Sequence, residues 1–260
     1  FIKCTCAVLM RHSELLMYAV YADLRVEVAR RLLGVLWWVL EPLMFMLVFY
    51  LVFGLGMRQG GPEYAPFLLC GMVPWKWFDG SVRQASTALV ANVGLMQQVF
   101  VPKYILVLTQ LVTNSVKFLI ILSLLILLVV GLGKRPSLEW LGLVPLIAVQ
   151  FVLISSLGLL LGAVIPFAQD LKQVVDNVLM LMMFMSGIFF DAQTMPESWQ
   201  GLFQFNPMLQ VIEAYRAVLL HNSWPDWAGL GYVLLVSAPL MLLAVLLLRR
   251  FERHYPKLIF

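Results

Sequence analysis

Six apolar stretches, each about as long as a lipid bilayer is thick, constrain the fold of this chain more than any other feature. They cover roughly residues 35–57, 66–90, 104–130, 140–165, 174–190 and 227–248. A helix needs about 20 mostly apolar residues to cross the roughly 30 Å hydrocarbon core of a membrane. Only 12% of the 260 residues are charged, about half the share that is usual in a soluble domain. The sequence therefore predicts an all-α integral membrane protein with six transmembrane helices, occupying residues 35–248.

The flanking segments are more polar. In residues 1–34, apolar and charged side chains alternate at helical spacing from about residue 12 to residue 33, with Arg25, Arg30 and Arg31 among the charges. This pattern is typical of an amphipathic helix that lies on the membrane surface with its arginines at the headgroups. Residues 249–260 form a short basic tail.

The connection before the last apolar stretch contains two short helix-like segments. The first runs from Pro196 to about Phe205, and the second from Pro207 to Leu220, with Asn206 as its expected N-cap. Neither is long enough to cross a bilayer, so both are expected to be re-entrant or interfacial.

The distribution of lysine and arginine predicts the orientation. If both termini are cytoplasmic, eleven of these residues lie on the cytoplasmic side and four on the other side. Cytoplasmic loops carry the excess of positive charge in membrane proteins. Both termini are therefore expected to face the cytoplasm, and the net charge of +4 reflects topology and does not indicate nucleic-acid binding.

The sequence contains no motif for catalysis or cofactor binding. There is no G-x-x-x-x-G-K-[ST] loop for nucleotide phosphates, no HExxH and no G-x-S-x-G. The three histidines are scattered, and Cys4, Cys6 and Cys70 are expected to be unpaired structural residues. We therefore expect no catalytic residue, no metal and no bound cofactor, and the chain is not expected to be an enzyme.

Several charges lie at membrane depth, where an ionised side chain is costly unless it is paired or faces a wet cavity. Lys76, Asp79 and Arg83 share one face of the second stretch, and Asp79 is able to pair with both neighbours. Glu41 lies near the start of the first stretch and Lys117 within the third. Glu41 is either a functional carboxylate or one that the helix N-terminus stabilises. Pro74 is expected to break or tilt the second helix.

Aromatic residues form stripes at helical spacing, which suggests either sugar stacking or packing against lipid and neighbouring helices. The residues of the candidate glycan surface are Phe45, Phe49, Tyr50 and Phe53 in the first stretch, and Phe184 and Phe189 in the fifth.

The connection before the last stretch carries Glu213 and Arg216, three residues apart. These two residues either have a function or form a local ion pair.

Short motifs in a fixed order carry a family resemblance across nearly the whole chain. They are Leu33-Gly-Val-Leu-Trp-Trp-Val-Leu-Glu-Pro-Leu43, Gly71-Met-Val-Pro-Trp-Lys-Trp-Phe78, Val99-Phe-Val-Pro-Lys103, Asn206-Pro-Met208 and Glu213-Ala-Tyr-Arg216. The chain resembles the transmembrane permease subunit of ATP-binding-cassette transporters that export O-antigen, capsule or teichoic acid.

This resemblance implies a homodimer in the bacterial inner membrane. Two copies of a separate ATPase subunit would bind ATP and Mg, and a lipid-linked polysaccharide would pass between the two permease copies, among membrane lipids. The amphipathic helix before Arg31 and a loop would dock on the ATPase, and the paired short helices would form a gate on the far side. The implied loop residues are Asn92, Leu95, Gln97, Gln98, Phe100, Pro102 and Lys103, and the implied gate residues are Trp199, Asn206, Pro207, Glu213, Tyr215 and Arg216.

Two alternatives fit the same sequence. One is an exporter of a drug or a lipid with the same architecture. The other is an ion-coupled secondary transporter that uses Lys76, Asp79, Arg83 and Lys117 as a relay. The glycan and its lipid carrier are not encoded in any recognisable motif.

Overall fold

The computed structural model describes residues 2–30, 34, 36–49, 51, 64–98, 101–190, 201, 203, 205–252 and 255. Side chains are described from residue 13 onward in these ranges, except those of residues 30, 42, 45, 46 and 49. Most of this part of the chain is helical and it contains no strand, which confirms the all-α prediction. The α-helices are α1 (Ile2–Arg30), α2 (Leu36–Phe49), α3 (Tyr64–Ala91), α4 (Val93–Gln98), α5 (Lys103–Gly131), α6 (Leu143–Val164), α7 (Leu171–Met185), α9 (Pro207–Leu219) and α10 (Trp227–Phe251).

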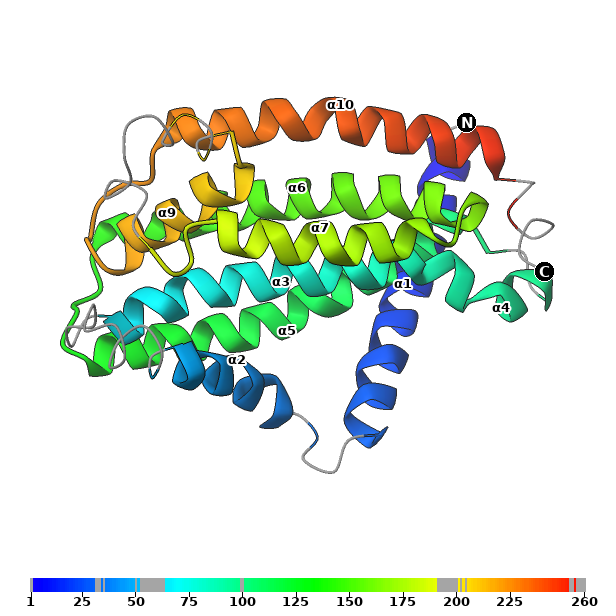
Figure 1. Cartoon of the computed structure of the whole chain (residues 1–260). Helices are drawn as coiled ribbons and strands as arrows, with labels where there is room; N and C mark the ends of the chain where they lie inside the picture. Colours follow the sequence, from blue (N-terminus) through cyan, green and yellow to red (C-terminus); the bar gives the residue numbers. More distant parts are fainter. Residues whose placement is uncertain are drawn as a thin grey trace.

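The long helices α3, α5, α6, α7 and α10 run side by side along one axis (Figure 1). Helix α6 packs along α10 and against α3, and α3 also packs against α5 and α7. Helix α1 crosses this axis and contacts α5, while α2 lies against α3 and α5. The start of α1, the end of α10 and α4 lie at one end of the bundle, and α9 lies toward the other end (Figure 1).

Three segments of the described chain are long and apolar enough to cross a membrane. They are Lys103–Gly131, Leu138–Phe167 and Trp227–Phe251. The second of them joins α6 to the short 3-10 helices η2 (Leu138–Gly142) and η3 (Ile165–Phe167). Each has more than the roughly 20 mostly apolar residues that a helix needs to cross a bilayer. The sequence prediction places these three spans within a few residues of the observed ones.

The other three predicted spans are less clear. Helix α3 has 28 residues, but Lys76, Asp79 and Arg83 lie within it. The described parts of the first and fifth spans, α2 and α7, have 14 and 15 residues, which is about 21–23 Å of helix at 1.5 Å per residue. The structure therefore confirms three candidate spans and leaves the count of six as a prediction.

Two details of the predicted helices differ from the structure. Helix α3 continues through Pro74 without a break, so of the two predicted effects of this proline the break is wrong. The fifth span was expected to reach residue 190, but α7 ends at Met185, and Gly187 then adopts φ +68°. A left-handed backbone conformation ends a right-handed helix and is favourable only for glycine. Phe189 therefore lies beyond the helix.

Small residues bring α6 close to α3 and α5. At Gly158 an added Cβ atom would lie 2.9 Å from the Cβ of Ala85, and at Gly162 it would lie 2.9 Å from the Ala85 carbonyl oxygen. Glycines four residues apart on one helix face let helices approach closely in a membrane, where dispersion contacts replace the hydrophobic effect as the driving force. The tight α3–α6 packing fixes the position of α3, the helix that carries Lys76, Asp79 and Arg83.

Candidate functional site

The charges that were predicted to lie at membrane depth form ion pairs, most of them between helices. Lys76 on α3 donates to Glu41 on α2, with 2.9 Å between Nζ and Oε1. This pair connects two helices that are 35 residues apart in sequence. Glu41 therefore has an identified partner, which sequence reasoning did not assign to it.

Arg83 lies between two carboxylates. Its Nε donates to Asp79 Oδ1 at 2.8 Å, one helical turn earlier on α3. Its Nη1 donates to the carboxylate of Asp176 on α7. The sequence predicted the pair with Asp79 but missed Asp176, because only the tertiary arrangement brings α7 beside α3.

Lys117 is buried on α5 and forms an ion pair with Glu27 of α1. Its Nζ also donates to Asn114 Oδ1 at 3.2 Å, and Asn114 donates to Gln84 Oε1 of α3 at 2.9 Å. A second polar contact between α1 and α5 joins Gln110 and Asp23. Helix α1 is thus joined by charged groups to the bundle that it crosses.

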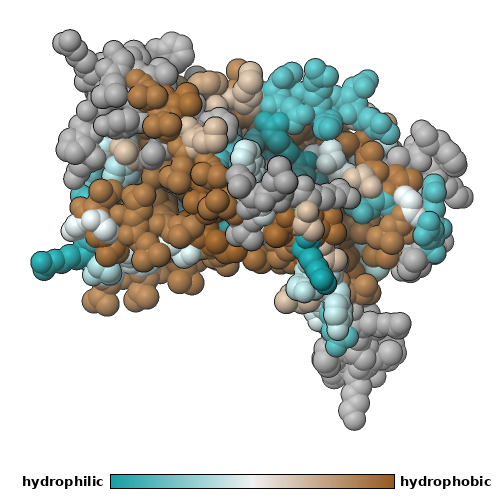
Figure 2. Space-filling model, turned by 90° about the horizontal axis from the view of Figure 1, so that it is seen from below, coloured by the Kyte–Doolittle hydropathy of each residue, from teal (hydrophilic) through white to brown (hydrophobic). Residues whose placement is uncertain are grey.

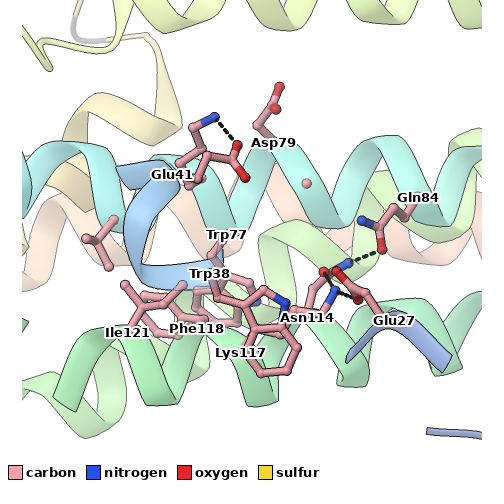
Figure 3. A pocket seen from close by; sticks show the side chains of 13 residues that line it. Glu27, Trp38, Glu41, Trp77, Asp79, Gln84, Asn114, Lys117, Phe118 and Ile121 are labelled. Atoms are coloured by element: carbon pink, nitrogen blue, oxygen red, sulfur yellow. Dashed lines mark hydrogen bonds and ion pairs between the residues drawn. The ribbon is translucent and has the colours of Figure 1, made fainter. Parts of the chain in front are cut away.

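Several of these polar groups line one cavity of about 170 Å³ between α1, α2, α3 and α5; they are Glu27, Glu41, Lys76, Asp79, Gln84, Asn114 and Lys117. Figure 3 shows its carboxylates, amines and amides together with the rings of Trp38, Trp77 and Phe118. The rings of Trp77 and Phe118 are stacked with their centroids 4.1 Å apart. The cavity is therefore both aromatic and polar, which suits a ligand that presents apolar faces and hydrogen-bonding groups.

At the end of the bundle away from α4, α9 begins as the sequence predicted. The side-chain oxygen of Asn206 accepts a hydrogen bond from Met208 N at 3.0 Å, and Pro207 occupies the first turn. Asn206 also donates to the Met185 carbonyl oxygen at the end of α7, at 3.1 Å. Asn206 therefore caps one helix and joins it to another.

Arg216 of α9 contacts both α3 and the segment that follows α7. It is buried and donates to the carbonyl oxygens of Gly187 at 2.7 Å and Ile188 at 2.8 Å. It also lies 3.5 Å above the ring centroid of Phe67 in α3. The neighbouring Tyr215 is fully buried. These contacts give Arg216 a structural role in addition to any role in a gate.

The expected ATPase-docking residues lie mainly at the other end. Leu95, Gln97 and Gln98 of α4 are exposed, whereas Asn92 and Pro102 are partly buried and Lys103 is buried. Phe100 and Arg31 lie outside the described residues, as does the Arg30 side chain, and Arg25 is exposed on α1.

The candidate glycan residues are only partly described. Phe184 is exposed and Phe189 is buried, with their ring centroids 5.7 Å apart. Tyr50, Phe53 and Trp199 lie outside the described residues, as do the side chains of Phe45 and Phe49. Only Leu179 of α7 is buried, so this helix exposes most of its apolar side chains. Figure 2 shows apolar side chains over the left and centre of the face seen from below, with a broad hydrophilic region at its upper right.

Comparison with known sequences decides the family. The family described as ABC-2 type transporter matches residues 16–220 of this chain. The chain belongs to the ABC-2 type transporter family. This family membership accounts for an apolar helical chain that carries no nucleotide-binding motif.

Three relatives illustrate the range of the family. The O-antigen export system permease protein RfbA of Klebsiella pneumoniae is 28% identical over 211 residues, covering 81% of this chain and 82% of the relative. The polysialic acid transport protein KpsM of Escherichia coli is 23% identical over 233 residues, covering 88% and 90%. The daunorubicin resistance ABC transporter permease protein DrrB1 of Streptomyces coeruleorubidus is 29% identical over 226 residues, covering 83% and 78%.

Among the described residues, no group of three or more histidine, cysteine, aspartate or glutamate side chains is arranged to hold a metal ion. Glu41, Asp79 and Asp176 instead accept hydrogen bonds from cationic side chains.

Proposed function

We propose that this chain is the membrane half of an ATP-driven exporter of lipid-linked polysaccharide of the O-antigen, capsule or teichoic-acid type. The observation that carries the proposal is the match to ABC-2 permeases named for O-antigen export and polysialic acid transport, over four fifths or more of the chain. ATP and Mg would bind to a separate ATPase subunit, present in two copies.

In this proposal the bundle crosses the bacterial inner membrane six times, with both termini in the cytoplasm. The start of α1, the end of α10 and the exposed residues of α4 lie at one end (Figure 1), which supports a single docking region for the ATPase there. Helix α9 lies toward the other end and is too short to cross, which supports a re-entrant or interfacial gate. Helix α1 crosses the bundle axis, as expected of a surface helix.

A second copy of the chain is the proposed partner for the exposed face of α7. Its exposed apolar side chains include Val178, Leu181 and Phe184, and the glycan would pass along this face between the two copies. The variant Leu181→Cys, with Cys4 and Cys6 replaced by serine, is expected to cross-link two chains in membranes. Leu235→Cys, at an exposed position of α10, is the matched control, and this variant is expected to remain largely monomeric. Equal cross-linking at both positions would contradict this interface.

The function is tested in a bacterial strain that lacks its own polysaccharide exporter. Co-expression of this chain with its ATPase should restore polysaccharide on the cell surface, and a substitution of the P-loop lysine in the ATPase should abolish it. Surface polysaccharide that persists without ATP hydrolysis would refute ATP-driven export and favour the ion-coupled alternative.

Drug export is the second candidate, because the daunorubicin resistance permease DrrB1 is 29% identical to this chain. The same strain distinguishes the two functions. Restored polysaccharide without drug resistance supports the first, whereas resistance to a hydrophobic drug without surface polysaccharide supports the second.

A further inference from the structure

The cavity between α1, α2, α3 and α5 contains a buried hydrogen-bond donor without a partner. Trp38 lines the cavity and is only 7% exposed. Its indole N–H has no hydrogen-bond acceptor within the described part of the chain. An unpaired buried donor is unfavourable, and buried polar groups in proteins are nearly always hydrogen-bonded. The unpaired N–H of Trp38 therefore indicates that a ligand or an ordered water completes the site.

The charges of the cavity disfavour an anion. Its wall carries three carboxylates, on Glu27, Glu41 and Asp79, and two amines, on Lys76 and Lys117. Each amine forms an ion pair with a carboxylate of the same wall. The third carboxylate, Asp79, is already paired with Arg83. A phosphate or pyrophosphate would therefore find no unpaired cation in this wall and would have to displace an existing ion pair.

The remaining chemistry fits a neutral polyol. Carboxylate and amide oxygens accept hydrogen bonds from hydroxyl groups, and the amide and indole N–H groups donate to hydroxyl oxygens. Figure 3 shows the rings of Trp38, Trp77 and Phe118 gathered on one side of the cavity, with Glu41 and Asp79 across from them. Sugar rings combine apolar C–H faces, which pack on aromatic rings, with hydroxyl groups around the edge.

We propose that this cavity is a sugar-binding subsite within each protomer and holds one neutral sugar unit of the exported glycan. The inference rests on the proposed function, but it assigns a site separate from the passage between two copies. The volume of about 170 Å³ is on the order of ten times what a single water needs, at about 10–15 Å³. This is room for one ring and not for a chain.

The cavity is preformed, because contacts within the chain hold its aromatic rings in place. Trp77 stacks on Phe118 and its indole N–H donates to Ser115 Oγ at 3.3 Å, which fixes the ring orientation. Phe118 in turn meets the ring of Tyr215 in α9 edge-on, with the centroids 6.3 Å apart. A sugar bound here would contact an aromatic series that extends to the helix at the far end of the bundle.

Binding is tested with the permease–ATPase complex in lipid nanodiscs, using neutral methyl glycosides as probes and inorganic phosphate as the anionic comparison. Saturation-transfer NMR should detect at least one methyl glycoside, and phosphate should not compete with it. Trp38→Phe keeps the ring but removes the N–H, and should reduce both the transfer signal and export about fivefold to tenfold. Trp37→Phe is the matched control, because Trp37 is 39% exposed, and should change neither.

A second variant fills the cavity. Gly80 lines it, and an added Cβ atom there meets nothing within 4 Å, so Gly80→Leu should block sugar binding at a normal membrane level. Gly231→Leu, at an equally open position on α10, is its control. Unchanged glycoside binding in both cavity variants, or displacement of the glycoside by phosphate, would overturn the proposed subsite. Neither result would contradict the proposed export function. Absence of polysaccharide export by the wild-type complex would instead overturn the proposed function.

Discussion

Replacement of Arg216 by alanine should destabilise the protein strongly. Arg216 is 5% exposed and donates to the buried carbonyls of Gly187 and Ile188 at 2.7 and 2.8 Å. A hydrogen bond from a charged group contributes roughly 1.5–3 kcal/mol, and a buried carbonyl left without a donor adds a penalty. Contact with the Phe67 ring contributes about 1 kcal/mol more. Allowing for relaxation, we expect a loss of about 3–5 kcal/mol.

This loss is measurable as a thermal shift. For a protein of this size, 1 kcal/mol corresponds to about 2–4 °C in the unfolding midpoint, so Arg216→Ala should lower the midpoint by at least about 6 °C. The assay heats a fluorescent fusion in detergent and measures the folded fraction by size-exclusion chromatography. Arg216→Lys should fall between wild type and alanine, because lysine keeps the charge but lacks the planar fork.

Lys172→Ala provides the control, because it removes a positive charge from an exposed position. Its midpoint should stay within about 2 °C of wild type, since surface substitutions usually change stability by less than about 0.5 kcal/mol. An Arg216→Ala midpoint as close to wild type as that of the control would refute the assignment of these hydrogen bonds as stabilising.

Three further predictions use the same expression system. Asp79→Ala should lower the amount of protein in the membrane only mildly, because Asp176 still neutralises Arg83. The double variant Asp79→Ala/Asp176→Ala should lower it severalfold, and equal immunoblot signals for the two variants would contradict this. Gly162→Ala should cost about 1–3 kcal/mol through overpacking, because its Cβ would lie 2.9 Å from a backbone oxygen of α3. Gly231→Ala should not lower the midpoint, and equal shifts for the two glycines would refute the packing argument. Asn206→Ala should cost about 1 kcal/mol by loss of the helix cap. Asn206→Asp should recover only part of it, because aspartate keeps the capping oxygen but cannot donate to the Met185 carbonyl oxygen, as the thermal midpoint will show.

The sequence was most informative where the membrane imposes the structure. The spans at α5, α6 and α10 were predicted within a few residues, because length and hydropathy alone determine whether a segment suits a bilayer. The start of α9 was also predicted, since Asn206 followed by Pro207 is a local signal that needs no tertiary context. Six spans, two cytoplasmic termini and a homodimer stay predictions, because they concern a membrane and a partner.

The sequence was least informative about partners across helices. Lys76, Asp79 and Arg83 share a face at helical spacing, so local pairing was the natural prediction. The carboxylates of Glu41 and Asp176 reach this face from other helices, and no periodicity reveals which residues of distant helices meet. Helix α3 continues through Pro74 for a related reason, because packing against α5 and α6 stabilises a helix that proline alone would disfavour.

The position of Arg216 has a consequence for motion at its end of the bundle. The side chain belongs to α9, while its acceptors follow α7 and its aromatic neighbour lies in α3. A displacement of any one of these segments breaks short bonds to the others, so the three must shift together or not at all. Packed elements held in this way switch between discrete arrangements rather than deforming continuously. Small thermal fluctuations would therefore leave the relative positions of α9, α3 and the segment after α7 unchanged, and a larger motion at this end would move all three together.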